Sequence, residues 1–81
     1  MNQLLGEIRL ITYEDMPAGW LKCEGQSLEM NKYPKLYMVI GTKFGQDGKF
    51  RFSLSDLREK APSGMAYCIA FEGSLPVAEN E

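Results

Sequence analysis

Residues 41–58 read Gly41-Thr42-Lys43-Phe44-Gly45-Gln46-Asp47-Gly48-Lys49-Phe50-Arg51-Phe52-Ser53-Leu54-Ser55-Asp56-Leu57-Arg58. This stretch holds three of the eight glycines of the chain and three of its four phenylalanines. Glycine adopts positive φ at little cost, so three glycines within residues 41–48 allow the backbone to turn sharply. Asp47-Gly48 is itself a strong turn signal. The alternation of Phe50, Phe52 and Leu54 then predicts a strand or extended segment that places aromatic rings in a core.

The length and composition indicate one small folded domain. A chain of 81 residues has room for a single domain with a thin core. Its hydrophobic fraction of 44% argues against disorder. The net charge of −2, with both signs mixed along the chain, speaks against nucleic acid as a partner. We expect no membrane span, because no apolar run approaches the required length of about 20 residues, and no signal peptide, because residues 1–5 lack its basic and apolar regions.

Four segments have strand-like patterns. Residues 6–12 alternate, with Ile8 and Leu10 on the face that we expect to be apolar. Residues 20–23 form a second short apolar segment, and residues 27–30 are expected to pair back on it as a hairpin. Residues 65–71 are the most continuously apolar run. They predict a strand covered on both faces, either central in a sheet or buried by another chain.

One segment has helical spacing instead. Its apolar side chains recur at intervals of three and four: Tyr33, Leu36, Tyr37 and Ile40. We expect a helix over about residues 32–40, capped by Asn31, with Pro34 in the first turn and Gly41 at its end. The predicted fold is therefore α+β: a small β-rich domain with one short helix packed on strands. Its core is expected to span residues 6–76, and residues 77–81 are expected to fray.

The chain contains no histidine, which removes the commonest general base and zinc ligand. The two cysteines, Cys23 and Cys68, do not have metal-binding spacing. We interpret them as two buried free thiols, with a single bridge as the alternative if their strands are neighbours. The prediction is no metal and no cofactor.

The remaining candidate sites are weak. Gly41, Gly45 and Gly48 are spaced loosely like a phosphate loop, but no Gly-Lys-Ser/Thr follows, and a structural turn is the preferred interpretation. Asp47-Gly48 matches only a fragment of a calcium loop. Arg58 beside Asp56 predicts an ion pair that braces the polar connector, with a surface ligand contact as the alternative.

The acidic and aromatic residues do not form a catalytic or sugar-binding pattern. A glycosidase needs two facing carboxylates, and nothing in the spacing brings two acids together among Glu7, Asp15, Asp47, Asp56 and Glu59. Trp20 and the tyrosines could stack on sugar rings, but they lie in apolar-patterned segments and are interpreted as core or interface. The sequence therefore predicts no enzyme and identifies no binding residue.

Six blocks of the chain, in order, resemble the phage tail collar domain family. They are GEIRL (6–10), PAGWLKCEGQ (17–26), YPKLY (33–37), IGTKFG (40–45) with DG (47–48), FSLSDLR (52–58) and YCIA (67–70). The resemblance covers nearly the whole stretch from Gly6 to Pro76. It implies a small β-rich domain with one short helix, found in tail fibres of bacteriophages and in phage-derived bacterial proteins, and often trimeric.

The chain also departs from that family. Longer members carry an extra segment between the last two blocks, and some have histidines that bind metal in a receptor-binding tip. Here only residues 59–66 separate these blocks, so neither the tip nor its metal is carried over. Ser55 stands where proline is common and Glu59 where glycine is common, which puts the local turn in doubt. The resemblance describes a minimal, stand-alone collar domain.

The expected function is a structural and interaction module of a phage or phage-derived tail fibre. The expected partners are further copies of the chain, with a trimer favoured, and tail-fibre or baseplate proteins. The expected location is a virion tail or phage-like particle, after synthesis in the bacterial cytoplasm. The alternatives are a glycan-binding adhesin that recognises cell-surface sugars and, behind it, a small hydrolase.

Overall fold

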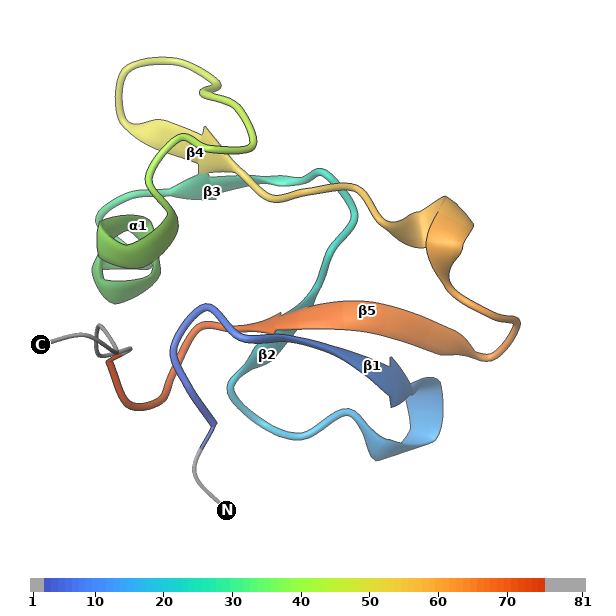
Figure 1. Ribbon diagram of the computed structural model, residues 1–81. Helices are drawn as coiled ribbons and strands as arrows, with labels where there is room; N and C mark the ends of the chain where they lie inside the picture. Colours follow the sequence, from blue (N-terminus) through green and yellow to red (C-terminus); the bar gives the residue numbers. More distant parts are fainter. Residues whose placement is uncertain (1–2, 76–81) are drawn as a thin grey trace, which may run out of the picture.

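The computed structural model describes residues 3–75 and contains five strands, one α-helix and two 3₁₀ turns (Figure 1). The strands are β1 (Ile8–Thr12), β2 (Trp20–Lys22), β3 (Ser27–Glu29), β4 (Arg51–Ser53) and β5 (Met65–Ala70). The helix is α1 (Pro34–Ile40), and the 3₁₀ turns are η1 (Tyr13–Asp15) and η2 (Arg58–Lys60). This composition confirms the predicted α+β class.

The larger sheet has the strand order β1-β5-β2, with all pairs antiparallel. The apolar segment at residues 65–71 is therefore a central strand, which is the first of the two positions that its continuous hydrophobicity predicts. Alternate residues of β5 serve two clusters on opposite faces, because successive side chains of a strand point to opposite sides. Ile69 belongs to one cluster, and Cys68 and Ala70 belong to the other.

The predicted hairpin between residues 20–23 and 27–30 is wrong. β2 pairs with β5, and β3 pairs with β4 in a separate two-stranded sheet, with Leu28 opposite Phe52. The chain leaves the first sheet at Gly25, where φ is 76°. The Gln26 side chain holds this turn by accepting from the Glu24 amide at 3.0 Å and donating to the Lys22 carbonyl at 2.8 Å. A turn of this kind carries β3 into the other layer instead of back along β2.

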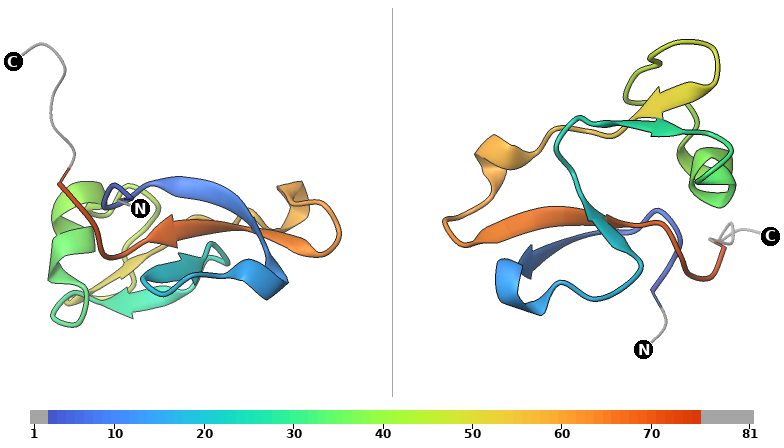
Figure 2. Two further views of the ribbon diagram at one scale, coloured as in Figure 1. Left: turned by 90° about the horizontal axis from the view of Figure 1, so that it is seen from below. Right: turned by 180° about the vertical axis from the view of Figure 1, so that it is seen from behind.

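The main core fills the space between the two sheets and α1 (Figures 1 and 2). Its buried members are Cys23, Leu28, Leu36, Phe52, Leu54 and Ile69. The helix contributes Leu36, which is fully buried, and half-buried Tyr33 and Tyr37 pack around it. The helix faces this core with the side that the three-and-four spacing predicts.

The ends of α1 differ partly from expectation. Pro34 lies in the first turn and Gly41 terminates the helix with φ 56°, as predicted. The N-cap residue is Tyr33 and not Asn31, and it makes no side-chain cap hydrogen bond. The two residues before it already form a turn, in which the Lys32 and Tyr33 amides donate to the Glu29 carbonyl. Asn31 is therefore too early in the chain to cap the helix.

The second cluster lies on the outer face of the larger sheet and contains Ile11, Trp20, Ala66, Cys68 and Ala70, with Met16 packed against them. Ile11 belongs to it because its β5 partner is Ala66. The apolar face expected for β1 is consequently only partly right. Ile8 and Leu10 share a face, but Ile8 is 40% exposed, because they lie at the outer edge of the sheet.

The exposure of Phe50 also differs from the prediction. Its side chain is 72% exposed, whereas Phe52 and Leu54 are fully buried as expected. β4 begins one residue later, at Arg51, and Phe50 contributes its carbonyl oxygen to the Met30 amide at 3.0 Å. Tyr37 of α1 packs against Phe52 in the main core, whereas Phe50 borders an open hollow beside Met30 and Asn31.

Candidate functional site

An open groove of about 750 Å³ surrounds the exposed Phe50 ring. It lies where the end of β3 meets the loop before β4, and its other lining residues are Glu29, Met30, Asn31, Asp47, Gly48, Lys49 and Arg51. The lining combines one aromatic ring, one amide, two acids and two bases. The two acids and two bases balance, so the lining carries no net charge.

The most firmly positioned side chain of this groove is Arg51. Its Nε donates to Ser27 Oγ at 2.7 Å, and its Nη2 donates to the Ser27 carbonyl at 3.1 Å. Glu29 Oε2 lies 3.8 Å from Arg51 Nη1 and 3.9 Å from Lys32 Nζ. These long ion pairs form a loose arrangement of partly exposed charges. The high exposure of Phe50 is the feature that distinguishes this groove. The alternating sequence pattern around Phe50 gave no indication that its side chain would be exposed.

The glycines of the loop serve the turn, as the sequence indicates. Gly45 and Gly48 adopt φ of 127° and 89°. The Gly45 amide donates to the Thr42 carbonyl at 3.0 Å, and the Gly45 carbonyl accepts from the Ser53 amide at 3.0 Å. The loop therefore uses the Gly45 amide to close itself, instead of offering it to a phosphate, and uses the Gly45 carbonyl to cover the edge of β4.

Trp20 is part of the core. Its side chain is 6% exposed, and the Arg9 guanidinium lies over its ring at 5.3 Å. Such a ring cannot act as an open platform for sugars, so this part of the adhesin alternative is wrong. Tyr33 packs edge-on against Phe71 at 5.4 Å. Of the tyrosines, Tyr13 is 57% exposed, with the Lys22 ammonium over its ring at 4.7 Å.

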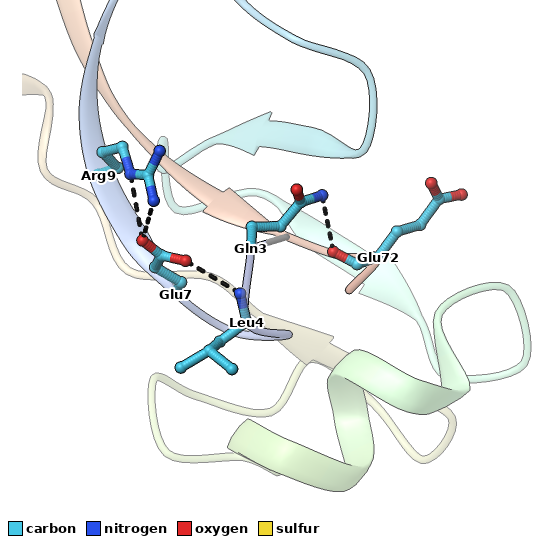
Figure 3. Close-up of polar contacts among 5 residues, drawn as sticks. All are labelled: Gln3, Leu4, Glu7, Arg9 and Glu72. Carbon is cyan, nitrogen blue, oxygen red and sulfur yellow. Dashed lines mark hydrogen bonds and ion pairs between the residues drawn. The ribbon is translucent and has the colours of Figure 1, made fainter. Parts of the chain in front are cut away.

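The acidic candidates are engaged locally. Glu7 accepts from the Leu4 amide at 3.0 Å and forms an ion pair with Arg9, while Gln3 donates to the Glu72 carbonyl nearby (Figure 3). The Leu4 amide and the Arg9 side chain lower the pKa of Glu7. These contacts fix the N-terminal segment beside the end of β5.

Two other acids from the candidate list have close partners. Asp15 accepts from Thr12 Oγ1 at 2.9 Å. Asp56 pairs with Arg58 at 2.8 Å, which bears out the predicted ion pair, and this guanidinium and then the Arg58 amide lower the pKa of Asp56. Asp56 and Glu59 line the same shallow hollow of about 610 Å³ together with two cations, so its charges are balanced and it offers no isolated pair of carboxylates.

Cys23 and Cys68 are free, as preferred, and buried on opposite sides of the larger sheet. Burial raises the pKa of both thiols. Cys68 Sγ lies 3.4 Å from Met16 Sδ within the second cluster. Within residues 3–75, no group of three histidine, cysteine, aspartate or glutamate side chains could hold a metal ion.

The comparison with known families gives a direct result. A family model described as Phage Tail Collar Domain matches residues 6–68, which is more than half of the chain. Neither the curated proteins nor the solved structures include a significant match. In the described part of the chain, no helix has the length and apolarity to cross a membrane. The matched range includes the buried Trp20, the helix α1 and the glycine–phenylalanine stretch. The chain therefore belongs to the phage tail collar domain family and is, by that membership, a structural module of a phage tail fibre.

Proposed function

We propose that this module associates with further copies of itself and holds neighbouring tail-fibre or baseplate proteins, with three copies as the favoured number. The supporting observation is a set of large apolar side chains on the surface of a small domain. These are Leu4, Ile8, Tyr13, Met38, Val39, Phe44, Phe50 and Leu75, with exposed fractions between 36% and 72%. Contiguous exposed apolar surface marks an interaction site in soluble proteins.

Part of this surface is concentrated at the junction of α1 and the N-terminal segment. Val39 packs so closely on Gly6 that a Cβ added there would lie 3.0 Å from Val39 Cγ1. Leu4 and Ile8 flank Gly6 in the chain and are 48% and 40% exposed, and Met38 beside Val39 is 63% exposed. We call these four residues (Leu4, Ile8, Met38 and Val39) the apolar junction. Burial of this surface against another chain would stabilise the assembly by about 25 cal/mol per Å² of apolar area.

Light scattering coupled to size exclusion, over a wide range of protein concentration, tests self-association. The expected result is a mass above that of one chain, falling towards it on dilution. Val39→Glu should weaken the assembly, because it introduces a charge into the apolar junction. Thr42→Glu, at an exposed position of the loop after α1, is the matched control. A strict monomer at every concentration would rule out the proposed self-association.

A second candidate, binding of a cell-surface glycan, is supported by the groove at Phe50. Its exposed ring, amide and carboxylates are the groups with which proteins stack on and hydrogen-bond sugars. A glycan array with the wild-type protein and Phe50→Ala tests this function. Glycan binding that is present in the wild type and lost in Phe50→Ala supports this function. An array on which the wild type binds no glycan contradicts it.

A further inference from the structure

β1 is an edge strand whose outer side is open in the described part of the chain (Figures 1 and 2). Ile8 lies opposite Ile69, so continuing this register by one residue places Glu7 opposite Ala70. The Ala70 amide donates to the Glu7 carbonyl at 2.9 Å. Hydrogen bonding alternates along an antiparallel pair. The backbone groups of Arg9 and Ile11 therefore face β5, and those of Ile8 and Leu10 point outward.

Such an edge is a template for another strand. Natural edge strands are commonly protected by proline, lysine, a bulge or a covering loop. β1 reads Ile-Arg-Leu-Ile-Thr and extends over five residues, with Ile8 40% exposed. Leu4 and Val39 add exposed apolar surface beside the start of this strand. The strand therefore offers outward backbone groups and apolar side chains together.

The charges next to Ile8 favour one particular partner. Glu7 and Arg9 lie on the same face of the strand, on either side of Ile8, and form an ion pair within the chain (Figure 3). Arg9 is additionally held over Trp20 at 5.3 Å. An acid and a base spaced symmetrically about a central residue form a self-complementary pattern. If Ile8 lies opposite Ile8 of an antiparallel second copy, each Glu7 lies opposite an Arg9.

We infer that β1 pairs with β1 of a second copy of this chain, antiparallel and centred on Ile8, so that two three-stranded sheets join into one. The outward backbone groups of Ile8 form the central hydrogen-bonded pair, and the two Glu7–Arg9 contacts flank it on one face. A register centred on Leu10 would also use outward backbone groups. It would pair all five residues of β1, whereas the register centred on Ile8 pairs residues 7–9, because the chain turns at Gly6 and the Gly6 amide already donates to Ala70. The register centred on Leu10 places Arg9 opposite Ile11, however, and loses both charge pairs.

This inference rests on the self-association in the proposed function and specifies one of its contacts. A twofold contact closes at two copies. A threefold contact through a different surface is compatible with it and would give six copies. The number of copies alone therefore does not decide the matter, and the test must address the strand itself.

Charge reversal supplies that test. Glu7→Arg carries two arginines beside Ile8 and Arg9→Glu carries two glutamates, so each variant places like charges opposite each other in its own pair. Mixing the two restores every charge pair. We expect each variant alone to associate at least tenfold more weakly than the wild type, and the equimolar mixture to form mixed assemblies with the wild-type affinity. Native mass spectrometry resolves the mixed species, and thermal melting of each variant checks that it is folded.

Proline substitutions provide a second, backbone-level test. Ile8→Pro removes the outward N–H at the centre of the pair while sparing the bonds to β5. Thr12→Pro is the matched control, because its N–H also points outward but lies outside the paired stretch, and Thr12 already has φ −71°, which proline adopts readily. The first variant should lose the twofold contact and the second should keep it.

The outcomes separate the two proposals. Mixed assemblies that form only on combining the charge variants, together with loss of the contact in Ile8→Pro, support the β1 pairing. Assemblies that persist unchanged in Glu7→Arg, Arg9→Glu and Ile8→Pro overturn it and leave self-association standing. A wild-type protein that stays monomeric overturns both.

Discussion

The ring of Tyr37 packs against the ring of Phe52, with centroids 5.3 Å apart and planes inclined by 54°. This contact joins α1 to β4 across the main core, where Phe52 is completely buried. A helix of seven residues is unstable alone and depends on such contacts. Phe52, in the stretch that follows the helix, therefore fixes the position of α1.

Phe52→Ala should destabilise the domain by about 3–5 kcal/mol, because it opens a cavity in the middle of the main core. This loss is a large part of the total stability of a small domain, about 5–15 kcal/mol, and should leave much of the protein unfolded near physiological temperature. Urea titration followed by tryptophan fluorescence measures it. Phe50→Ala is the matched control and should change stability by less than about 0.5 kcal/mol, since its ring is exposed. Equal losses in both variants would contradict this assignment of the core.

Gly73→Ala should also be destabilising, for a backbone reason. Gly73 has φ 148°, and an added Cβ would overlap the carbonyl oxygen of Gln3, which accepts from the Ser74 amide. The expected cost exceeds the roughly 1–2 kcal/mol of positive φ alone. Gly64→Ala is the control, because Gly64 has φ 81° with open space around it. The melting temperature should fall further for Gly73→Ala than for Gly64→Ala. A larger fall for Gly64→Ala would show that the N-terminal segment does not pack against residue 73.

Stability should decrease at acid pH through Glu7 and Asp56. The Leu4 amide and Arg9 lower the pKa of Glu7, and Arg58 lowers that of Asp56. A carboxyl group whose pKa is lower in the folded state stabilises the fold above its unfolded pKa and loses this contribution as the pH falls through its folded pKa. The decline should therefore begin below about pH 4–5 and continue to lower pH. Melting curves of the wild type and of Glu7→Gln and Asp56→Asn between about pH 7 and pH 2 measure it.

Each of the two substitutions should make the loss of stability at acid pH slightly less steep, because both carboxyl groups are at least partly exposed and solvent screens their interactions. Glu59→Gln, which removes an exposed carboxyl group on η2, is the control. A profile as steep in both variants as in the wild type would show that these contacts do not persist in solution.

Both cysteines should resist alkylation in the native protein. Burial raises the pKa of Cys23 and of Cys68, and the reactive species is the thiolate. Iodoacetamide at about pH 8 should leave the folded protein largely unlabelled and should add two labels in denaturant, as read by mass spectrometry. Because the thiols lie in different clusters, mild oxidation should not join them within one chain. Rapid labelling of the native protein would indicate that one of the clusters opens.

The amino-acid sequence by itself determined the local elements of this protein. The uninterrupted apolar run at residues 65–71 predicts a strand covered on both faces, and the spacing of Leu36 and Tyr37 predicts the buried side of the helix. Gly41 predicts the end of that helix. These predictions hold because they depend on periodicity and backbone preference, which act within a few residues.

The tertiary structure alone decided which elements meet. β3 pairs with β4 and not with β2, although β2 is nearer in the chain, because the turn at Gly25 and Gln26 carries β3 away from the larger sheet. Ile8 is exposed because β1 lies at an edge, and Phe50 is exposed because it borders an open groove outside the main core. Strand partners and surface positions depend on contacts between residues far apart in the sequence, so an alternating pattern identifies a strand but not the neighbour that covers it.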